Sequence, residues 1–73
     1  MNVTYVSNEA YSQYLGAGLY SLYDNNKDEK QLNVYIISIG MQKASLKKLK
    51  ATAKLFNREV NIIDFNNIKD KLG

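Results

Sequence analysis

Hydrophobic residues along the chain alternate between two kinds of spacing. Residues 2–6, 32–38 and 59–65 are short runs rich in β-branched and aromatic side chains, which favour strands. Between these runs, residues 11–23 and 43–57 carry hydrophobic residues three and four positions apart, which is the period of a helix buried along one side. Polar residues separate the segments. The pattern therefore predicts the order strand, helix, strand, helix, strand.

Short connections limit how these segments can pack. Two parallel strands joined through a helix form a right-handed crossover. Two successive crossovers predict an α/β fold with parallel strands in the order 3-2-1, the βαβαβ half of a doubly wound, Rossmann-like sheet. Because the run at 32–38 is almost continuously apolar, we expect helices to cover both faces of the sheet. Residues 66–73 could begin a further helix.

The first strand is predicted at an exposed edge of this sheet. In a doubly wound sheet a fourth strand pairs along its free side, and the 73 residues contain no such strand. An unpaired edge tends to associate with another strand. We therefore expect either a homo-oligomer or a partner that docks on this edge.

Each predicted helix has a side that faces the core. In the first helix this side consists of Tyr11, Tyr14, Leu15, Gly18, Leu19 and Leu22. In the second helix it consists of Leu46, Leu49, Ala53 and Phe56. Gly16 and Gly18 have no side chain, so we expect them to let the first helix lie close against the sheet.

Lysines line the other side of the second helix, namely Lys43, Lys47, Lys50 and Lys54, with Lys48 beside them. Such a row could follow the phosphates of nucleic acid or bind an anionic lipid surface. It is also the pattern of a solvated face on an amphipathic helix. No aromatic residue interleaves the lysines and arginine is nearly absent. We therefore interpret the row as a solvated face and expect no nucleic-acid partner.

The composition narrows the class of protein. A chain of 73 residues forms one domain at most, and the absence of cysteine and histidine excludes disulfides and the usual zinc ligands. The sequence has no signal-peptide pattern and no apolar run of the roughly 20 residues that span a membrane. A net charge of +3 is too small to select a partner. We expect a cytoplasmic protein without a transmembrane segment.

A polar turn, Ser7-Asn8-Glu9, follows the first strand. Ligands of open parallel sheets bind at the carboxyl ends of the strands, which is where this turn lies. The backbone amides of Val6 and Ser7 could bind the edge of a flat base such as uracil. The side-chain amide of Asn8 could pair with it and the ring of Tyr11 could stack on it. Alternatively, Asn8 only caps the helix and Tyr11 is its first core residue. The turn lacks the G-x-G-x-x-G motif of dinucleotide sites.

Three stretches of the sequence resemble the start of glycosyltransferase family 8, the group of lipopolysaccharide galactosyltransferases and glycogenin. They are residues 3–26 (VTYVSNEAYSQYLGAGLYSLYDNN), 32–40 (LNVYIISIG) and 46–65 (LKKLKATAKLFNREVNIIDF). The resemblance covers nearly the whole chain but only about the first quarter of a typical member. It depends on the order of these stretches and not on a single motif.

The resemblance implies a GT-A fold that binds a UDP-sugar with Mn²⁺ and transfers a hexose with retention of configuration. In the family, a small residue and then Asp at the end of the first strand, with Tyr shortly after, contact the uracil. The corresponding nucleotide-binding positions here are Val6, Ser7, Asn8 and Tyr11. Asn8 stands where Asp is usual, which keeps the acceptor and loses the charge.

Other departures from the family pattern weaken the case for intact function. Ala10 stands where many members have Asn, and Ile39 replaces a frequent Asp before Gly40. The Asp-x-Asp metal motif would follow Gly73, and the chain has no His to complete a manganese site. Asp64, at the end of the third strand, is expected to cap the next turn, with a contact to substrate as the alternative.

We therefore expect residues 1–73 to be a single partial nucleotide-sugar-binding domain, the N-terminal portion of a larger hexosyltransferase. Catalytic residues and metal ligands are expected outside it, so the isolated chain should be inactive and should bind UDP-sugar weakly or not at all. The alternative is a non-catalytic α/β module that self-associates or docks a partner through its first-strand edge.

Overall fold

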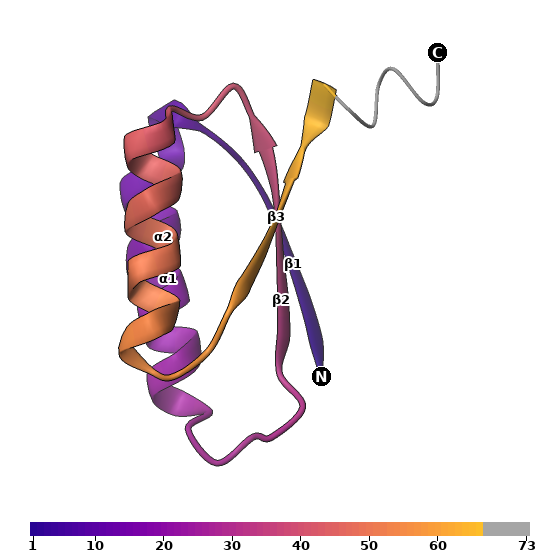
Figure 1. Cartoon of the computed structure of the whole chain (residues 1–73), viewed down its shortest axis with the longest axis vertical. Helices are drawn as coiled ribbons and strands as arrows, with labels where there is room; N and C mark the ends of the chain where they lie inside the picture. The colour runs from indigo at the N-terminus through magenta and orange to yellow at the C-terminus, as the bar shows by residue number, and fades with distance from the viewer. Residues whose placement is uncertain (67–73) are drawn as a thin grey trace.

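The computed structural model describes residues 1–66 (Figure 1). Its elements, in chain order, are β1 (Asn2–Asn8), the 3-10 turn η1 (Glu9–Tyr11), α1 (Ser12–Asn25), β2 (Asn33–Ile39), α2 (Lys43–Leu55) and β3 (Val60–Asp64). The predicted order of strands and helices is confirmed, and the bounds differ by a few residues. Apart from Asn66, the further helix predicted for the tail lies outside the described residues.

The strands form one parallel sheet in the order β1-β2-β3, which is the predicted order read from the other edge. The register places Val3 opposite Val34 and Val34 opposite Val60. Tyr5, Ile36 and Ile62 form a second row of the same kind. Within residues 1–66, β1 pairs with β2 alone, so its other edge is unpaired.

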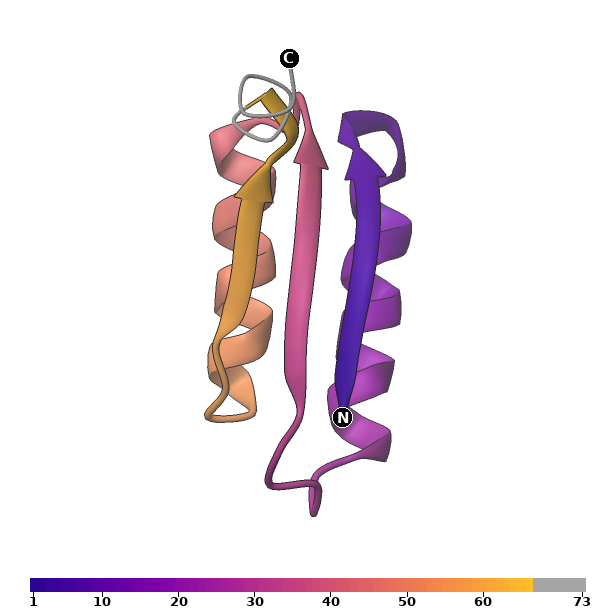
Figure 2. The ribbon, with the colours of Figure 1, turned by 90° about the vertical axis from the view of Figure 1, so that its right-hand side faces the viewer.

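Both helices lie on the same face of the sheet, so the prediction of cover on both faces is wrong. Figure 1 shows the sheet edge-on with α1 and α2 on one side, and Figure 2 shows the bare strands in front of both helices. The reason is geometric. The two crossovers run in the same direction along the sheet, and right-handed crossovers that run in the same direction place their helices on the same face.

The core lies between the sheet and the two helices. Its buried apolar residues are Leu15, Leu19, Tyr23, Leu32, Val34, Ile36, Met41, Leu49 and Ala53. The predicted core side of α2 is confirmed, with Leu49 and Ala53 buried and Leu46 and Phe56 packed against them. That of α1 is confirmed at Leu15 and Leu19.

Two tyrosines predicted for the core side of α1 are instead exposed. Tyr11 is 61% exposed and Tyr14 is 76% exposed. Tyr23, four positions after Leu19, is fully buried and packs against Phe56 with 5.7 Å between ring centroids. The buried side of α1 therefore passes through Leu15, Leu19 and Tyr23, and the two earlier tyrosines do not belong to it.

The helical glycines do not mediate close packing. A Cβ atom added at Gly16 or Gly18 would have no neighbour within 4 Å, so the prediction of close approach to the sheet is wrong. Gly40 is different, because its φ of +66° at the end of β2 lies in the left-handed region that favours glycine. Asn57 adopts a similar φ of 61° just after α2.

Arg58 forms a clamp that joins the end of α2 to the connection between α1 and β2. α2 ends in a Schellman motif, in which the Arg58 backbone N–H donates to the carbonyl of Ala53 at 3.0 Å. The Arg58 guanidinium donates to the carbonyls of Asn26 at 3.0 Å and Glu29, in the connection between α1 and β2. It also lies 5.8 Å from the centroid of the Tyr23 ring. The end of α2 is thereby tied to the end of α1.

None of the helices in residues 1–66 is both long and apolar enough to cross a membrane.

Candidate functional site

The four residues predicted to bind a nucleotide lie where β1 meets η1, at the carboxyl end of the sheet (Figure 2). Side chains alternate along the strand, so Val6 lies on the open face and is 64% exposed, whereas Ser7 is buried on the helix-covered face. Asn8 ends the strand and Tyr11 ends the turn. The structure therefore brings Asn8 and Tyr11 together and separates the side chains of Val6 and Ser7.

Asn8 caps the turn that follows it. Its side-chain oxygen accepts a hydrogen bond from the backbone N–H of Tyr11 at 3.3 Å, so the capping interpretation is confirmed. The Asn8 side chain is exposed, and its NH₂ group donates to no other residue in the described part of the chain. The Ser7 hydroxyl donates to the carbonyl of Asn8 at 3.0 Å. Of the Ser7 and Asn8 side chains, only that of Asn8 retains a free donor that faces solvent.

Tyr11 presents its ring to solvent beside a second tyrosine. The ring centroids of Tyr11 and Tyr14 lie 6.4 Å apart, with their planes inclined by 50°. The interpretation of Tyr11 as the first core residue of the helix is wrong, because its ring packs outside the core. An exposed aromatic ring at the end of a parallel strand can stack on a flat ligand.

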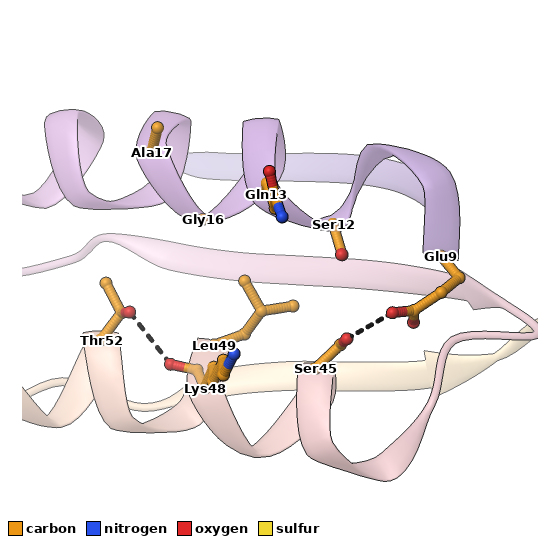
Figure 3. Close-up of a pocket in the computed structure, with 9 residues that line it drawn as sticks. All are labelled: Glu9, Ser12, Gln13, Gly16, Ala17, Ser45, Lys48, Leu49 and Thr52. Atoms are coloured by element: carbon orange, nitrogen blue, oxygen red, sulfur yellow. Dashed lines mark hydrogen bonds between the residues drawn. The ribbon is translucent and has the colours of Figure 1, made fainter.

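Glu9, the third residue of the polar turn, holds the start of α2. Its carboxylate accepts a hydrogen bond from the backbone N–H of Gln42 at 2.9 Å. It also accepts one from the Ser45 hydroxyl at 2.7 Å (Figure 3). The helix has no side-chain cap from Gln42 itself and no acidic residue in its first turn. A carboxylate at this end also faces the positive end of the helix dipole. The polar turn therefore positions the second helix.

These contacts shift the ionisation of Glu9. The hydrogen bond from Gln42, then that from Ser45, and the charge of Lys48 lower the pKa of the Glu9 carboxyl, against a smaller opposing effect of desolvation. Glu9 is therefore ionised at neutral pH. Sequence reasoning missed this role, although one signal was present. The segment before α2 offers Gln42 and Lys43 where a helix start usually has a small polar or acidic residue.

A groove of about 440 Å³ runs between α1 and α2 from this turn (Figure 3). Its lining comprises Glu9, Ser12, Gln13, Gly16, Ala17, Ser45, Lys48, Leu49 and Thr52. The residues on the α1 side are small or uncharged, and two of the α2 residues already have partners. Ser45 donates to Glu9, and Thr52 donates to the carbonyl of Lys48 at 3.0 Å. The groove leaves few free polar groups for a ligand.

The carboxylates in the described residues do not form a metal site. Asp64 accepts a hydrogen bond from the backbone N–H of Asn66 at 2.8 Å, which confirms that it caps the turn after β3. Glu9 is committed to the start of α2. Within residues 1–66, no three His, Cys, Asp or Glu side chains gather closely enough to hold a metal ion. Residues 1–66 therefore do not fit a manganese site.

No protein-family profile and no curated protein sequence matches this chain. Its fold is similar to two solved structures of LgtC. One, an active-site mutant of LgtC, has a TM-score of 0.75 at 16% sequence identity, covering 88% of this chain and 22% of the LgtC chain. The other, the galactosyltransferase LgtC in complex with donor and acceptor sugar analogues, has a TM-score of 0.74 at 16% identity, covering 88% and 23%. The chain therefore spans less than a quarter of these structures, and its α/β fold is similar to that part of LgtC.

Proposed function

We propose that residues 1–73 form the UDP-sugar-binding portion of a retaining hexosyltransferase, with Val6, Ser7, Asn8 and Tyr11 as the nucleotide contacts. The observation that carries the proposal is the turn after β1, where an exposed ring and an exposed side-chain amide lie three residues apart at the carboxyl end of the sheet. The similarity of the fold to LgtC supports the same reaction class.

Each contact has a distinct role in this proposal. The Tyr11 ring stacks on the uracil, which requires the exposed ring face that Tyr11 has. The free NH₂ of Asn8 donates to a uracil carbonyl. Val6 and Ser7 contribute through the backbone, because the Ser7 side chain is buried and bonded to the neighbouring carbonyl. Consecutive N–H groups of a strand point to opposite edges, so one of the two faces the unpaired edge of β1 and the other faces β2.

This chain supplies binding and not the transfer reaction. Sugar transfer from UDP is assisted by a cation that neutralises the diphosphate leaving group, and residues 1–66 offer no cluster to hold one. We therefore expect neither transferase activity nor hydrolysis of UDP-sugar from the 73-residue chain, even when Mn²⁺ is added. Turnover above the buffer rate would contradict this assignment.

Titration with UDP, followed by amide chemical shifts, tests the binding site directly. We expect the largest shifts at Ser7, Asn8 and Tyr11. ADP is the control, since it carries the same diphosphate on a different base, and it should shift the α2 lysines alone. Tyr11→Ala should abolish the UDP shifts at Ser7 and Asn8. Tyr14→Ala, which removes a more exposed ring three residues later, should retain them. Equal shifts from UDP and ADP at every residue would overturn the proposal.

A second candidate function is a non-catalytic module that self-associates or binds a partner through β1. The unpaired edge of β1 favours it, because exposed strand edges recruit further strands. It predicts a homo-oligomer by light scattering, together with slow hydrogen exchange at the outward-facing amides between Val3 and Val6. A monomer in which these amides exchange rapidly would exclude self-association through β1 and leave the nucleotide proposal unaffected.

A further inference from the structure

The outer face of α2 concentrates positive charge that the rest of the described chain does not neutralise. The helix contains five lysines and no acidic residue in 13 positions. All five lysines are exposed, and none makes an ion pair within residues 1–66, where the recorded pair joins Lys27 to Asp24 at 3.1 Å. Lys48 lies close enough to lower the pKa of Glu9 without forming such a pair.

The neighbouring helix lacks this charge. α1 lies beside α2 on the same face of the sheet (Figure 2), and its only charged residue is Asp24. Solubility alone therefore does not account for the lysines, since both helices are exposed to solvent on their outer sides. Of the two helices, α2 alone carries this positive charge.

The lysines flank a strip of exposed apolar side chains. Ala44, Ala51 and Leu55 are all exposed, and their spacing of seven and four residues places them along one side of the helix. Leu55 is 75% exposed at the last position of α2. At 100° per residue, four lysines lie on one side of this strip and Lys48 lies on the other.

A shallow depression of about 430 Å³ adjoins this surface at the start of β3. Its lining consists of Lys47, Lys50, Ala51, Lys54, Arg58, Glu59 and Val60. Four of these side chains are cationic and one is anionic. The depression can therefore receive a phosphate group beside the apolar strip.

We propose that this outer face of α2, defined by its five lysines with Ala44, Ala51 and Leu55, docks on an anionic phospholipid surface. The lysines attract the lipid phosphates, and Leu55 inserts at the boundary between headgroups and acyl chains. Peripheral binding to a membrane surface combines the same two contributions, attraction of basic residues to anionic headgroups and burial of apolar side chains.

Two features favour lipid over nucleic acid as the partner. Nucleic-acid surfaces combine basic residues with aromatic rings on which bases stack, and the outer face of α2 has no aromatic residue. The strip that separates the lysines is apolar, and Leu55 at its end is 75% exposed. An apolar side chain surrounded by lysines gains nothing from a phosphodiester backbone and gains burial in a bilayer.

The geometry leaves the other surfaces accessible. α2 packs on the sheet through Leu49 and Ala53, so its outer face is directed away from the sheet. A bilayer on that side lies parallel to the helices and opposite the open face of the sheet (Figure 1). The proposal does not depend on nucleotide binding.

Flotation of the 73-residue chain with vesicles tests the proposal. We expect binding to vesicles that contain about one third phosphatidylglycerol, loss of binding to pure phosphatidylcholine, and weakening as salt is raised. Lys47→Gln/Lys50→Gln should weaken vesicle binding at least tenfold, because each lysine near the surface contributes a factor of roughly five. The control Lys27→Gln/Lys30→Gln makes the same change in net charge away from α2 and should leave binding within twofold.

Leu55→Ser distinguishes binding to a lipid surface from binding to phosphate groups alone. It should weaken vesicle binding severalfold and leave binding to inorganic polyphosphate or to a single-stranded RNA oligonucleotide unchanged. Because Leu55 is exposed, the variant should fold, which circular dichroism checks. The proposal is overturned if the two lysine double variants behave alike, if Leu55→Ser binds vesicles as tightly as the native chain, or if RNA binds more tightly than anionic vesicles.

Discussion

The two faces of the sheet are made of similar residues in different surroundings. On β2, Val34 and Ile36 point toward the helices and are fully buried, while Tyr35 and Ile37 point the other way and are half-buried. Val6, Ile37 and Ile63 form a row across the open face, of which Val6 is 64% exposed. The comparison teaches that a strand can have the hydrophobic pattern typical of cover on both faces although the described chain covers only one of them.

The largest expected difference between the faces is in stability. Ile36→Ala should lower the free energy of unfolding by about 3 kcal/mol, because it leaves a cavity in the core. Ile37→Ala, at the next position on the same strand, should cost about 1 kcal/mol, since its side chain is already in partial contact with water. Urea unfolding followed by circular dichroism measures both.

A domain of this size has only about 4–10 kcal/mol of stability, so Ile36→Ala would leave about 1 kcal/mol at the low end of that range. Ile36→Val, expected to cost about 1 kcal/mol, keeps the comparison measurable against Ile37→Val. Equal costs at the two positions would show that the open face is covered in solution.

The next effect concerns the clamp that joins the two helices on the covered face. Arg58→Met should lower the free energy of unfolding by about 1–2 kcal/mol, because the carbonyls of Asn26 and Glu29 lose a charged donor. Arg58→Lys is the matched variant. It keeps the charge but lacks the planar group that reaches several carbonyls at once, so it should recover only part of the loss. Full recovery would contradict the clamp.

The order of elements and the parallel sheet could be predicted from the sequence because they follow from local patterns. Hydrophobic period distinguishes strands from helices, and right-handed crossovers leave one arrangement of three parallel strands. The face on which the helices lie follows from the same rule applied to both crossovers together. The prediction of cover on both faces is wrong because it gives the continuous apolar run at 32–38 more weight than this geometric rule.

The candidate site was predictable only in part. The capping role of Asn8 is local and was foreseen as one alternative. The roles of Glu9 and Arg58 depend on partners 33 and 32 residues away in sequence. Such contacts depend on where the elements meet in space, which hydrophobic period does not encode. The exposure of Tyr11 had the same origin, since the angular position at which α1 packs decides which of its tyrosines is buried.

A smaller effect, and one that depends on pH, is expected at the start of α2. The hydrogen bonds from Gln42 and Ser45 hold the pKa of Glu9 below its usual value of 4.5, so the folded state favours the ionised carboxylate. This stabilisation is present above about pH 4.5 and is lost as the pH falls through the lowered pKa. Glu9→Gln should therefore be less stable than the native chain at pH 7, and the difference should shrink below pH 4.

Thermal unfolding at a series of pH values measures this effect. Asp28→Asn is the control, because it removes one carboxylate charge from an exposed position in the connection between α1 and β2. Its unfolding temperature should follow that of the native chain at every pH. A Glu9→Gln variant that behaves like this control would mean that the carboxylate does not hold α2.

The smallest expected effect is on the open face, and it is the most informative about what covers that face. Val6→Thr keeps the β-branched shape on a strand and adds a hydroxyl at a position that is 64% exposed. In a chain whose open face meets water, the free energy of unfolding should change by less than about 0.5 kcal/mol. Val3→Thr makes the same replacement three residues earlier, on the covered face, and should cost more, because it places a hydroxyl against the core. Unfolding measured at several protein concentrations completes the test. A cost at Val6 that matches the cost at Val3 and grows with protein concentration would mean that a second copy covers the open face. The contrast between the two faces would then hold for the monomer alone.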